Sequence, residues 1–427
     1  MLTEIINLNS IIKSIDIIGL WGIKDISFSL SSDVNILIGD NGTGKTTVLK
    51  LIEAILNLNL SIIDDIQFTE IYIHLYNKSN DSIKIECIFN EINKIYKYTF
   101  NNNDSYNVTA TEERRLTYRK RIYTNTQYDQ LHEKLHNLIN ISWLPINRID
   151  FENNKQPEDI GNNIDIKLNL LMNQLISFRL QLETKVNEAT KNFTNKIIKL
   201  LLYNKEYDSV PSPDKVRKRK IQKEKLIQDL SNTFNNIGNN IISDDEIRLH
   251  VEQIMNIIEK STRSAAIFRA DELLSFSLLN RTLEILTLSN NYQEERTAIL
   301  EPITIYIETL RYYFKNKDIK LDQNYGLMPF LSGKDGGKYL PIYSLSSGEK
   351  QLLILLTEIL IQQQKPFVFI ADEPELSLHI EWQHNLISSI RKLNPNVQVI
   401  FATHAPEIAA NYPDNIINLN NVTSYTK

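Results

Sequence analysis

Two short segments carry the residues whose types and spacing point to chemistry. The first, Gly39–Thr46, reads GDNGTGKT and fits the pattern G-x-x-x-x-G-K-[ST], in which backbone N–H groups and a lysine hold phosphates. The second, Phe367–Glu373, is an apolar run that ends in two carboxylates. More than 300 residues separate the two segments. The sequence therefore predicts a nucleotide site that is assembled from distant parts of the chain.

The phosphate-binding loop predicts a role for each of its residues. An apolar strand is expected before it, over Val34–Ile38, and a helix after it, over Thr46–Leu58, which is the context that the motif requires. Lys45 is expected to reach the β- and γ-phosphates, and Thr46 to ligate Mg²⁺. The predicted nucleotide-binding residues of this loop are Gly39, Asp40, Asn41, Gly42, Thr43, Gly44, Lys45, Thr46 and Thr47.

Two acids and a histidine follow neighbouring apolar strands later in the sequence. Asp372 and Glu373 come directly after Phe367–Ala371. His404 follows the next apolar strand, Val397–Ala402. The carboxyl ends of parallel strands meet at one edge of a sheet, which is where such sheets bind ligands. We expect Asp372 to hold Mg²⁺, Glu373 to polarise the attacking water and His404 to contact the γ-phosphate.

The segment Leu345–Glu349 reads LSSGE and opens a helix that is expected over Gly348–Gln363. Ser346 can cap this helix, and the amides around Gly348 form a positive helix N-terminus that suits an anion. Taken alone, such a segment is more commonly an ordinary N-cap.

In this order, the segments resemble the head of the ATP-binding-cassette ATPases. The resemblance assigns Walker A to Gly39–Thr46, the signature to Leu345–Glu349, and Walker B with the catalytic glutamate to Phe367–Glu373. His404 corresponds to the switch histidine, so the implied catalytic residues are Lys45, Glu373 and His404. The wide insertion between Walker A and the signature resembles the RecF and SMC branch. The segments LSSGE, ADEPELSLH and ATHAP look most like those of the overcoming-lysogenization-defect (OLD) ATPases.

The resemblance implies a fold, cofactors and a first partner. The fold class is α/β, a P-loop NTPase of the ATP-binding-cassette head type with an antiparallel β lobe and a helical, partly coiled-coil insertion. The cofactors are ATP and Mg²⁺. In this family the signature serine contacts the γ-phosphate bound by a second head, which implies an ATP-sandwich dimer or a higher homo-oligomer.

Changes in pattern along the chain predict three parts. Residues 1–150 form the first half of the head, with alternating strands that favour an antiparallel sheet. Residues 151–318 form the helical insertion, and residues 319–427 form the second half of the head, whose strand–helix alternation predicts a parallel sheet. The insertion carries a heptad-like apolar stripe of Leu168, Leu171, Leu175, Phe178, Leu182, Val186 and Ala189.

Two positions depart from the pattern of transporter heads. His379 replaces the aspartate of the D-loop, and the Q-loop glutamine has no clear counterpart. Gln67 lies too close to the Walker A lysine for that role. The predicted strand Ile141–Pro145 leads toward the expected loop, which favours Asn147 or Arg148 near the γ-phosphate. A structural ion pair is an equally good interpretation of Arg148.

Composition bounds the location of the chain. A hydrophobic content of 42% and a charged content of 23% are ordinary for a globular protein, and the net charge of −5 gives no overall attraction to nucleic acid. Cys87, the only cysteine, excludes an intramolecular disulfide and fits a reducing compartment. The first ten residues lack the pattern of a secretory signal, and no apolar run is long enough to span a bilayer. The sequence therefore predicts a cytoplasmic protein with no membrane partner.

The sequence after the switch histidine predicts a separate effector. OLD nucleases continue past this head into an acid-rich Toprim domain, whereas this sequence ends at Lys427. We therefore expect the nuclease or toxin to be another protein. Stand-alone heads of this kind resemble the ATPase subunits of bacterial anti-phage systems such as Septu, PARIS and some retrons. The alternative is a RecF-like DNA-binding ATPase of repair or chromosome maintenance.

Two basic runs leave the nature of further partners open. One is Lys215–Lys220, extended by Lys223 and Lys225, and the other is Arg114–Arg121. Such runs are typical of solvated helix faces, and they also fit contact with nucleic acid or an acidic protein.

Overall fold

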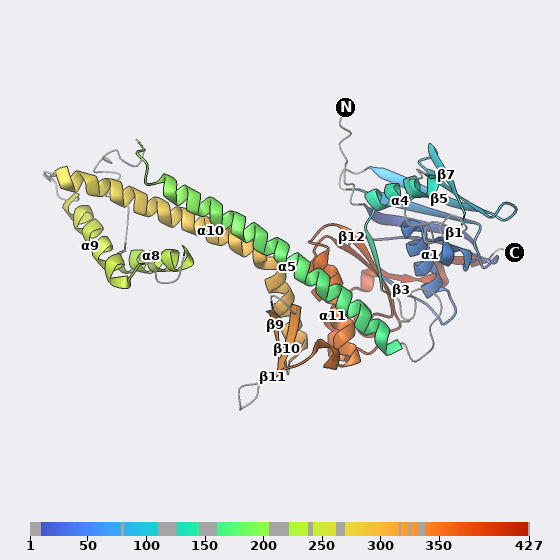
Figure 1. The fold of residues 1–427 in the computed structure, drawn as a ribbon. Helices are drawn as coiled ribbons and strands as arrows, with labels where there is room; N and C mark the ends of the chain where they lie inside the picture. Colours follow the sequence, from blue (N-terminus) through green and yellow to red (C-terminus); the bar gives the residue numbers. More distant parts are fainter. Residues whose placement is uncertain are drawn as a thin grey trace. The chain divides into compact units, whose positions relative to one another are not determined.

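The computed structural model describes residues 10–77, 81–109, 126–144, 160–204, 222–237, 242–261, 270–315, 317–322, 326–331 and 338–425 (Figure 1). The chain divides into two compact units. The head unit comprises residues 1–176 and 303–427, and the helical unit comprises residues 177–302. The boundaries predicted at 150 and 318 lie where the sequence pattern changes, whereas the two units are defined by their compactness. The division into three parts stays a prediction.

The head unit contains a five-stranded sheet in which all neighbours are parallel. Its strands are β3 (Val34–Ile38), β8 (Ile141–Leu144), β12 (Phe367–Asp372), β13 (Val397–Ala402) and β14 (Ile416–Asn418), in the order β14-β3-β13-β12-β8. Every residue of β12 and β13 is buried, as expected of apolar strands that are covered on both faces. The parallel sheet thus interleaves strands from both ends of the sequence.

A second sheet of the head unit is the predicted antiparallel lobe. Its strands are β1 (Ile11–Leu20), β2 (Lys24–Ser29), β4 (Glu70–Tyr76), β5 (Ser82–Asn90), β6 (Ile95–Phe100), β7 (Asp104–Val108) and β15 (Thr423–Tyr425), in the order β15-β2-β1-β4-β5-β6-β7. Buried and less buried residues alternate along β4, so one face packs on the core and the other is more open.

Helix α1 (Lys45–Asn57) joins the two sheets into one core. Nine of its 13 residues are buried. Seven of the nine are apolar and belong to a single cluster with Ile15 and Ile73 of the antiparallel sheet and Val368 and Ile400 of the parallel sheet. The helix that follows the phosphate-binding loop is therefore held on both sides by the sheets that frame the site.

The remaining elements in the described part of the head unit include six helices and a small third sheet. The helices are α2 (Leu60–Asp64), α4 (Gln127–Leu138), α11 (Ser347–Ile361), α12 (Ile380–Leu393), α13 (Pro406–Ala409) and α14 (Leu419–Val422). A three-stranded antiparallel sheet consists of β9 (Asp318–Asp322), β10 (Gly326–Leu331) and β11 (Lys338–Tyr339). The fold class predicted from the sequence, a P-loop ATPase head with an antiparallel lobe and a helical insertion, is confirmed.

The helical unit is built on parts of two long helices, α5 (Ile160–Lys199) and α10 (Ala270–Tyr313) (Figure 1). Within this unit Phe193 stacks on Tyr292 with ring centroids 4.9 Å apart, and the hydroxyl groups of Thr190 and Tyr292 lie 2.9 Å apart. Six residues of the predicted apolar stripe are buried, in keeping with helix packing: Leu168, Leu171 and Leu175 in the head unit, and Phe178, Leu182 and Ala189 in the helical unit. Val186 is partly buried.

Two shorter helices complete the helical unit. They are α8 (Lys223–Ile237) and α9 (Asp244–Ser261), which bury Leu230, Val251 and Ile254 in a cluster shared with Leu279 of α10. None of the helices in the described part of the chain is long and apolar enough to cross a membrane. The cytoplasmic location stays a prediction.

Candidate functional site

The predicted phosphate loop connects β3 to α1. Residues Gly39–Gly44 form the loop, and Lys45, Thr46 and Thr47 form the first turn of the helix. Gly39, Gly42 and Gly44 have φ angles of 154°, 82° and 102°, which residues with a Cβ rarely adopt. Within the loop the Thr43 side chain donates to the carbonyl of Asp40 at 2.9 Å. Asn41 is exposed, so the loop opens to solvent on that side.

The Walker A lysine connects the two ends of the chain. Lys45 is 7% exposed, and its ammonium group donates to the carbonyl of Gly39 at 2.9 Å. Its Nζ also lies 2.7 Å from Nε2 of His404. An ammonium group can only donate, so this imidazole nitrogen acts as the acceptor. The structure thus brings two of the predicted catalytic residues into direct contact.

The sheet register places the predicted acids beside the phosphate loop. Asp372 at the end of β12 lies opposite Ala402 of β13, which lies opposite Leu37 of β3. The loops after these three strands, which carry Glu373, His404 and Gly39, therefore start side by side. This is the arrangement that the sequence pattern predicts for a doubly covered parallel sheet.

Asp372 has the surroundings of a metal ligand. It is 2% exposed, and neither carboxylate oxygen has a hydrogen-bond partner in the described part of the chain. Burial raises the pKa of Asp372, while the nearby Thr46 hydroxyl and Lys45 ammonium partly oppose the shift. A buried carboxylate whose oxygens accept no hydrogen bond is costly, and the nearby Lys45 and Lys50 charges offset only part of that cost, because the pKa of Asp372 stays raised. The residues present therefore fit a divalent cation shared by Asp372 and Thr46.

Glu373 is held in an unusual backbone conformation next to His404. Its φ angle is 46°, which is rare for a residue with a Cβ and often marks a functional position. The backbone N–H of Glu373 donates to the carbonyl of Ala402 at 2.8 Å. One carboxylate oxygen accepts from the N–H of His404 at 3.4 Å, and the other lies 3.7 Å from Nε2 of the same residue.

The signature segment forms a capped helix start. The side chain of Ser346 accepts from the N–H of Glu349, and the backbone N–H of Ser346 donates to the Glu349 carboxylate at 2.8 Å, which completes a capping box at α11. Lys317 bonds the same carboxylate at 2.6 Å. Burial alone would raise the pKa of Glu349, but the hydrogen bonds from Lys317 and Ser346 outweigh it and hold the pKa below its usual range.

Gly348 makes a close approach to the loop after β12. A Cβ at this position would lie 2.2 Å from the carbonyl oxygen of Ser377, so only glycine fits there. The sequence assigned Gly348 to anion binding through its amide. The contact with Ser377 supplies a structural reason for the glycine that the sequence pattern did not indicate.

The departures from the transporter pattern have different outcomes. His379 is the N-cap of α12, where its side chain accepts from the N–H of Glu381. Gln67 lies on the antiparallel lobe, and its carbonyl accepts from the N–H of Trp21 at 2.8 Å. Asn147 and Arg148, the other two candidates for the Q-loop role, lie outside the described residues, as do the basic runs at 114–121 and 215–220.

Three residues beside the phosphate loop were not predicted. A Cβ on Gly44 would lie 3.0 Å from the ring of Trp21. Lys24 is 7% exposed, and its ammonium group lies 4.6 Å from the centroid of the same ring. Asn420 donates to the carboxylate of Asp40 at 2.8 Å. Trp21 lies in the β1–β2 turn, Lys24 begins β2 and Asn420 lies in α14, so no spacing along the sequence points to them.

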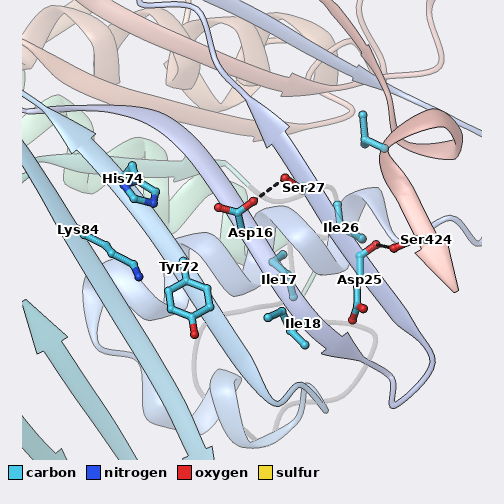
Figure 2. A pocket seen from close by; sticks show the side chains of 11 residues that line it. Asp16, Ile17, Ile18, Asp25, Ile26, Ser27, Tyr72, His74, Lys84 and Ser424 are labelled. Carbon is cyan, nitrogen blue, oxygen red and sulfur yellow. Dashed lines mark hydrogen bonds between the residues drawn. The ribbon is translucent and has the colours of Figure 1, made fainter. Parts of the chain in front are cut away.

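A separate hollow lies on the open face of the antiparallel lobe (Figure 2). Its volume is about 410 Å³, and the side chains of Asp16, Tyr72, His74 and Lys84 line it. The Lys84 ammonium lies 4.2 Å from the centroid of the Tyr72 ring. None of the predicted site residues lines this hollow.

Residues 11–409 match the family described as the AAA ATPase domain. The chain is similar to the probable ATPase of retron Vc95 from Vibrio cholerae serotype O1 biovar El Tor, with 21% identity over 93% of this chain and 70% of that protein. It is also similar to the probable ATPase of retron Ec83 from Escherichia coli, with 32% identity over 16% of this chain and 15% of that protein. Among solved structures, an Smc head domain with an extended coiled coil from Pyrococcus furiosus gives a TM-score of 0.47 at 14% identity, over 98% of this chain and 96% of the other.

Proposed function

Because the chain belongs to the AAA ATPase domain family, we propose that it binds ATP together with Mg²⁺ and hydrolyses it to ADP and phosphate. One observation carries this proposal. Lys45 contacts His404, whose backbone contacts Glu373, so three of the four chemically active groups meet at one edge of the parallel sheet. The fourth, Asp372, lies at the same edge with two buried carboxylate oxygens that have no partner among the described residues.

Each group has one role in the proposed reaction. The amides of the phosphate loop and the ammonium group of Lys45 bind the phosphates. Asp372 and Thr46 would hold Mg²⁺, which when bound neutralises charge on the β- and γ-phosphate oxygens. Glu373 orients the attacking water and polarises it by accepting a hydrogen bond from it. His404 contacts the γ-phosphate.

We propose that the complete site forms between two copies of the chain. The motive is the resemblance of Leu345–Glu349 to the signature motif, whose serine acts on a nucleotide bound by another head. Ser346 is the N-cap of α11, a helix of 15 residues whose N-terminus offers a positive end to a phosphate. In the described part of the chain its hydroxyl bonds Glu349 of its own helix, not a residue of the phosphate loop.

The function is tested by turnover of the purified chain with ATP and Mg²⁺. We expect slow hydrolysis that EDTA abolishes. Glu373→Gln should keep ATP binding and lose turnover by at least ~100-fold, because only the group that orients the water changes. Hydrolysis by Glu373→Gln at the wild-type rate would show that the catalytic assignment is wrong.

We further propose that the ATPase belongs to an anti-phage defence system and controls a separate effector. The similarity to a retron-associated probable ATPase, over 93% of this chain and 70% of that protein, supports this role over that of a DNA-repair ATPase. Co-purification of the chain with the product of its neighbouring gene, with and without ATP, tests it. Co-purification with a nuclease or toxin supports the proposal, whereas a tight complex with DNA alone supports the RecF-like alternative.

The basic run of the insertion offers a second test of partners. Neutralising it should leave ATP turnover nearly intact and should weaken partner or nucleic-acid binding, most strongly at low salt, where charges are least screened. The matched control removes the same charge from exposed positions of α5 in the helical unit. The variant changes Arg217, Lys218, Arg219 and Lys220, and the control changes Lys185, Lys191, Lys196 and Lys199. If the variant and the control bind the partner and nucleic acid equally well, the basic run is a solvated surface and not a binding site.

A further inference from the structure

Glu375 is a buried acid that none of the motifs explains. It lies two residues after Glu373, in the loop that follows β12, and is 5% exposed. The hydroxyl of Thr403 donates to one of its carboxylate oxygens. The N–H of Ala405 approaches the same oxygen at 3.3 Å. One carboxyl group therefore ties the loop after β12 to the loop after β13.

The contacts of Glu373 and Glu375 alternate along the histidine loop. Thr403 and Ala405 bond Glu375, and His404 between them donates its N–H to Glu373 at 3.4 Å. The N–H of Ala405 also donates to the hydroxyl of Thr403 at 2.8 Å, which closes the turn around the histidine. His404 is thus fixed on both sides by Glu375 while its own backbone faces Glu373.

The remaining oxygen of Glu375 is buried without a hydrogen-bond partner in the described part of the chain. Burial raises the pKa of Glu375 to about 7, with a smaller contribution from Glu373, while the hydrogen bond from Thr403 opposes the shift. A buried polar atom without a partner lowers stability, and such positions are often kept for function. An alanine or leucine would avoid this cost, but neither could accept from Thr403 and Ala405.

We propose that Glu375 is a positioning residue for ATP hydrolysis: its carboxyl group fixes the turn of Thr403 and Ala405 and thereby holds His404 next to Glu373. This inference rests on the proposed ATPase function and adds a residue outside the Walker and signature roles. Glu375 acts through the histidine loop and not on ATP itself. Its loss should therefore affect the chemical step more than nucleotide binding.

The test compares Glu375→Ala with Glu375→Gln by steady-state kinetics. Glu375→Ala should lower kcat by about 10-fold or more and leave KM within about 3-fold, since the phosphate loop and Lys45 are untouched. Glu375→Gln should return kcat to within about 3-fold of wild type, because the amide oxygen accepts the same two hydrogen bonds. Ser142→Ala is the matched control, since its hydroxyl also donates to a glutamate, Glu358, at 2.7 Å.

A second pair of variants covers the case in which Glu375→Ala does not fold. Thr403→Val removes the hydroxyl that Glu375 accepts from, and Thr403→Ser restores it. Thr403→Val should lower kcat, and it should cause no further loss when Glu375 is already alanine, because both changes break one contact. Circular dichroism and thermal melts confirm that each variant is folded.

The outcomes separate this inference from the function on which it rests. A wild-type chain without turnover would overturn both. Wild-type turnover with an unchanged kcat in Glu375→Ala would overturn the inference alone. A raised KM with unchanged kcat would also overturn it, because Glu375 would then act on nucleotide binding. The same holds if folded Glu375→Gln is as slow as Glu375→Ala, since hydrogen-bond acceptance would then not be the role.

Discussion

Nζ of Lys45 lies 2.7 Å from Nε2 of His404, so the first and last motifs of the chain meet in one contact. The lysine also donates to the carbonyl of Gly39 in its own loop. A phosphate oxygen carries more negative charge than a carbonyl or an imidazole nitrogen and forms a stronger hydrogen bond with an ammonium group. ATP should therefore displace both partners of Lys45 and free His404 for the γ-phosphate.

This exchange predicts different effects for the two residues. Lys45→Ala should weaken ATP binding by at least ~100-fold, because it removes the charge on the phosphates. His404→Ala should keep the Kd for ATP within about 3-fold and lower kcat by at least ~10-fold, because its contact matters after binding. Binding of a fluorescent ATP analogue and phosphate release measure the two quantities. An equal loss of binding in both variants would contradict the exchange.

A mixture of two inactive chains tests the composite site. Lys45→Ala retains its signature segment, and Ser346→Arg retains its phosphate loop, so mixed dimers should contain one intact site. Turnover of the mixture should exceed the sum of the two variants measured separately. Activity that never exceeds that sum would count against a site shared between copies.

The control for Ser346→Arg is another helix start of the same kind. Ser243 and Glu246 form a matching pair at α9, with the serine hydroxyl donating to the glutamate at 2.7 Å. Ser243→Arg removes an equivalent cap, worth about 1 kcal/mol, from the helical unit. Ser243→Arg should leave turnover unchanged. A loss of turnover that is seen only in Ser346→Arg is then caused by the change in the signature segment and not by the lost helix cap.

The sequence was sufficient for the fold class because the relevant signals are local. The strand–loop–helix around Gly39–Thr46 and the apolar strands before Asp372 and His404 dictate parallel neighbours that end at one edge. Lys45, Asp372, Glu373 and His404 come together there, whereas the Ser346 hydroxyl bonds Glu349 of its own helix; the roles of all these residues in binding and turnover stay predictions. The spacing of residues along the sequence does not predict which side chains touch where two loops meet, because the distance between two loops is set by the tertiary fold.

Glu375 and Gly348 show what the sequence could not supply. Glu375 belongs to the quoted ADEPELSLH segment, yet its role depends on Thr403, which another strand delivers. From the sequence, Gly348 is expected to bind an anion through its amide. In the structure, the carbonyl oxygen of Ser377 lies so close that a Cβ at position 348 would not fit. In both cases the deciding contact is tertiary.

The close approach of Gly348 predicts a structural effect of a single methyl group. In Gly348→Ala the new Cβ would meet the carbonyl oxygen of Ser377 at 2.2 Å, and backbone atoms cannot rotate away. We expect a loss of about 1–3 kcal/mol in the free energy of unfolding. Gly42→Ala is the control, because a Cβ there meets nothing within 4 Å and only the φ of 82° is strained. Urea unfolding of both variants measures the difference, and equal losses would contradict the packing argument.

The raised pKa of Glu375 predicts how stability depends on pH. Its folded pKa of about 7 lies above its ordinary value of 4.5, so the unfolded chain loses this proton at lower pH. The contribution of the protonated group to stability is therefore complete below pH 4.5 and is lost as the pH rises through 7. Glu375→Gln cannot ionise, so its stability relative to wild type should rise by about 2–3 kcal/mol between pH 5 and pH 8. Urea unfolding at several pH values measures this difference.

Glu246→Gln supplies the control for the pH series. Hydrogen bonds from the backbone and side chain of Ser243 lower the pKa of Glu246, so its contribution to stability is present above pH 4.5 and is lost only as the pH falls below that value. The difference between Glu246→Gln and wild type should therefore stay constant from pH 5 to pH 8. If the stability difference between Glu375→Gln and wild type is also constant from pH 5 to pH 8, Glu375 is already ionised in the folded chain at pH 5. In that case water or a cation would have to reach its unpartnered oxygen.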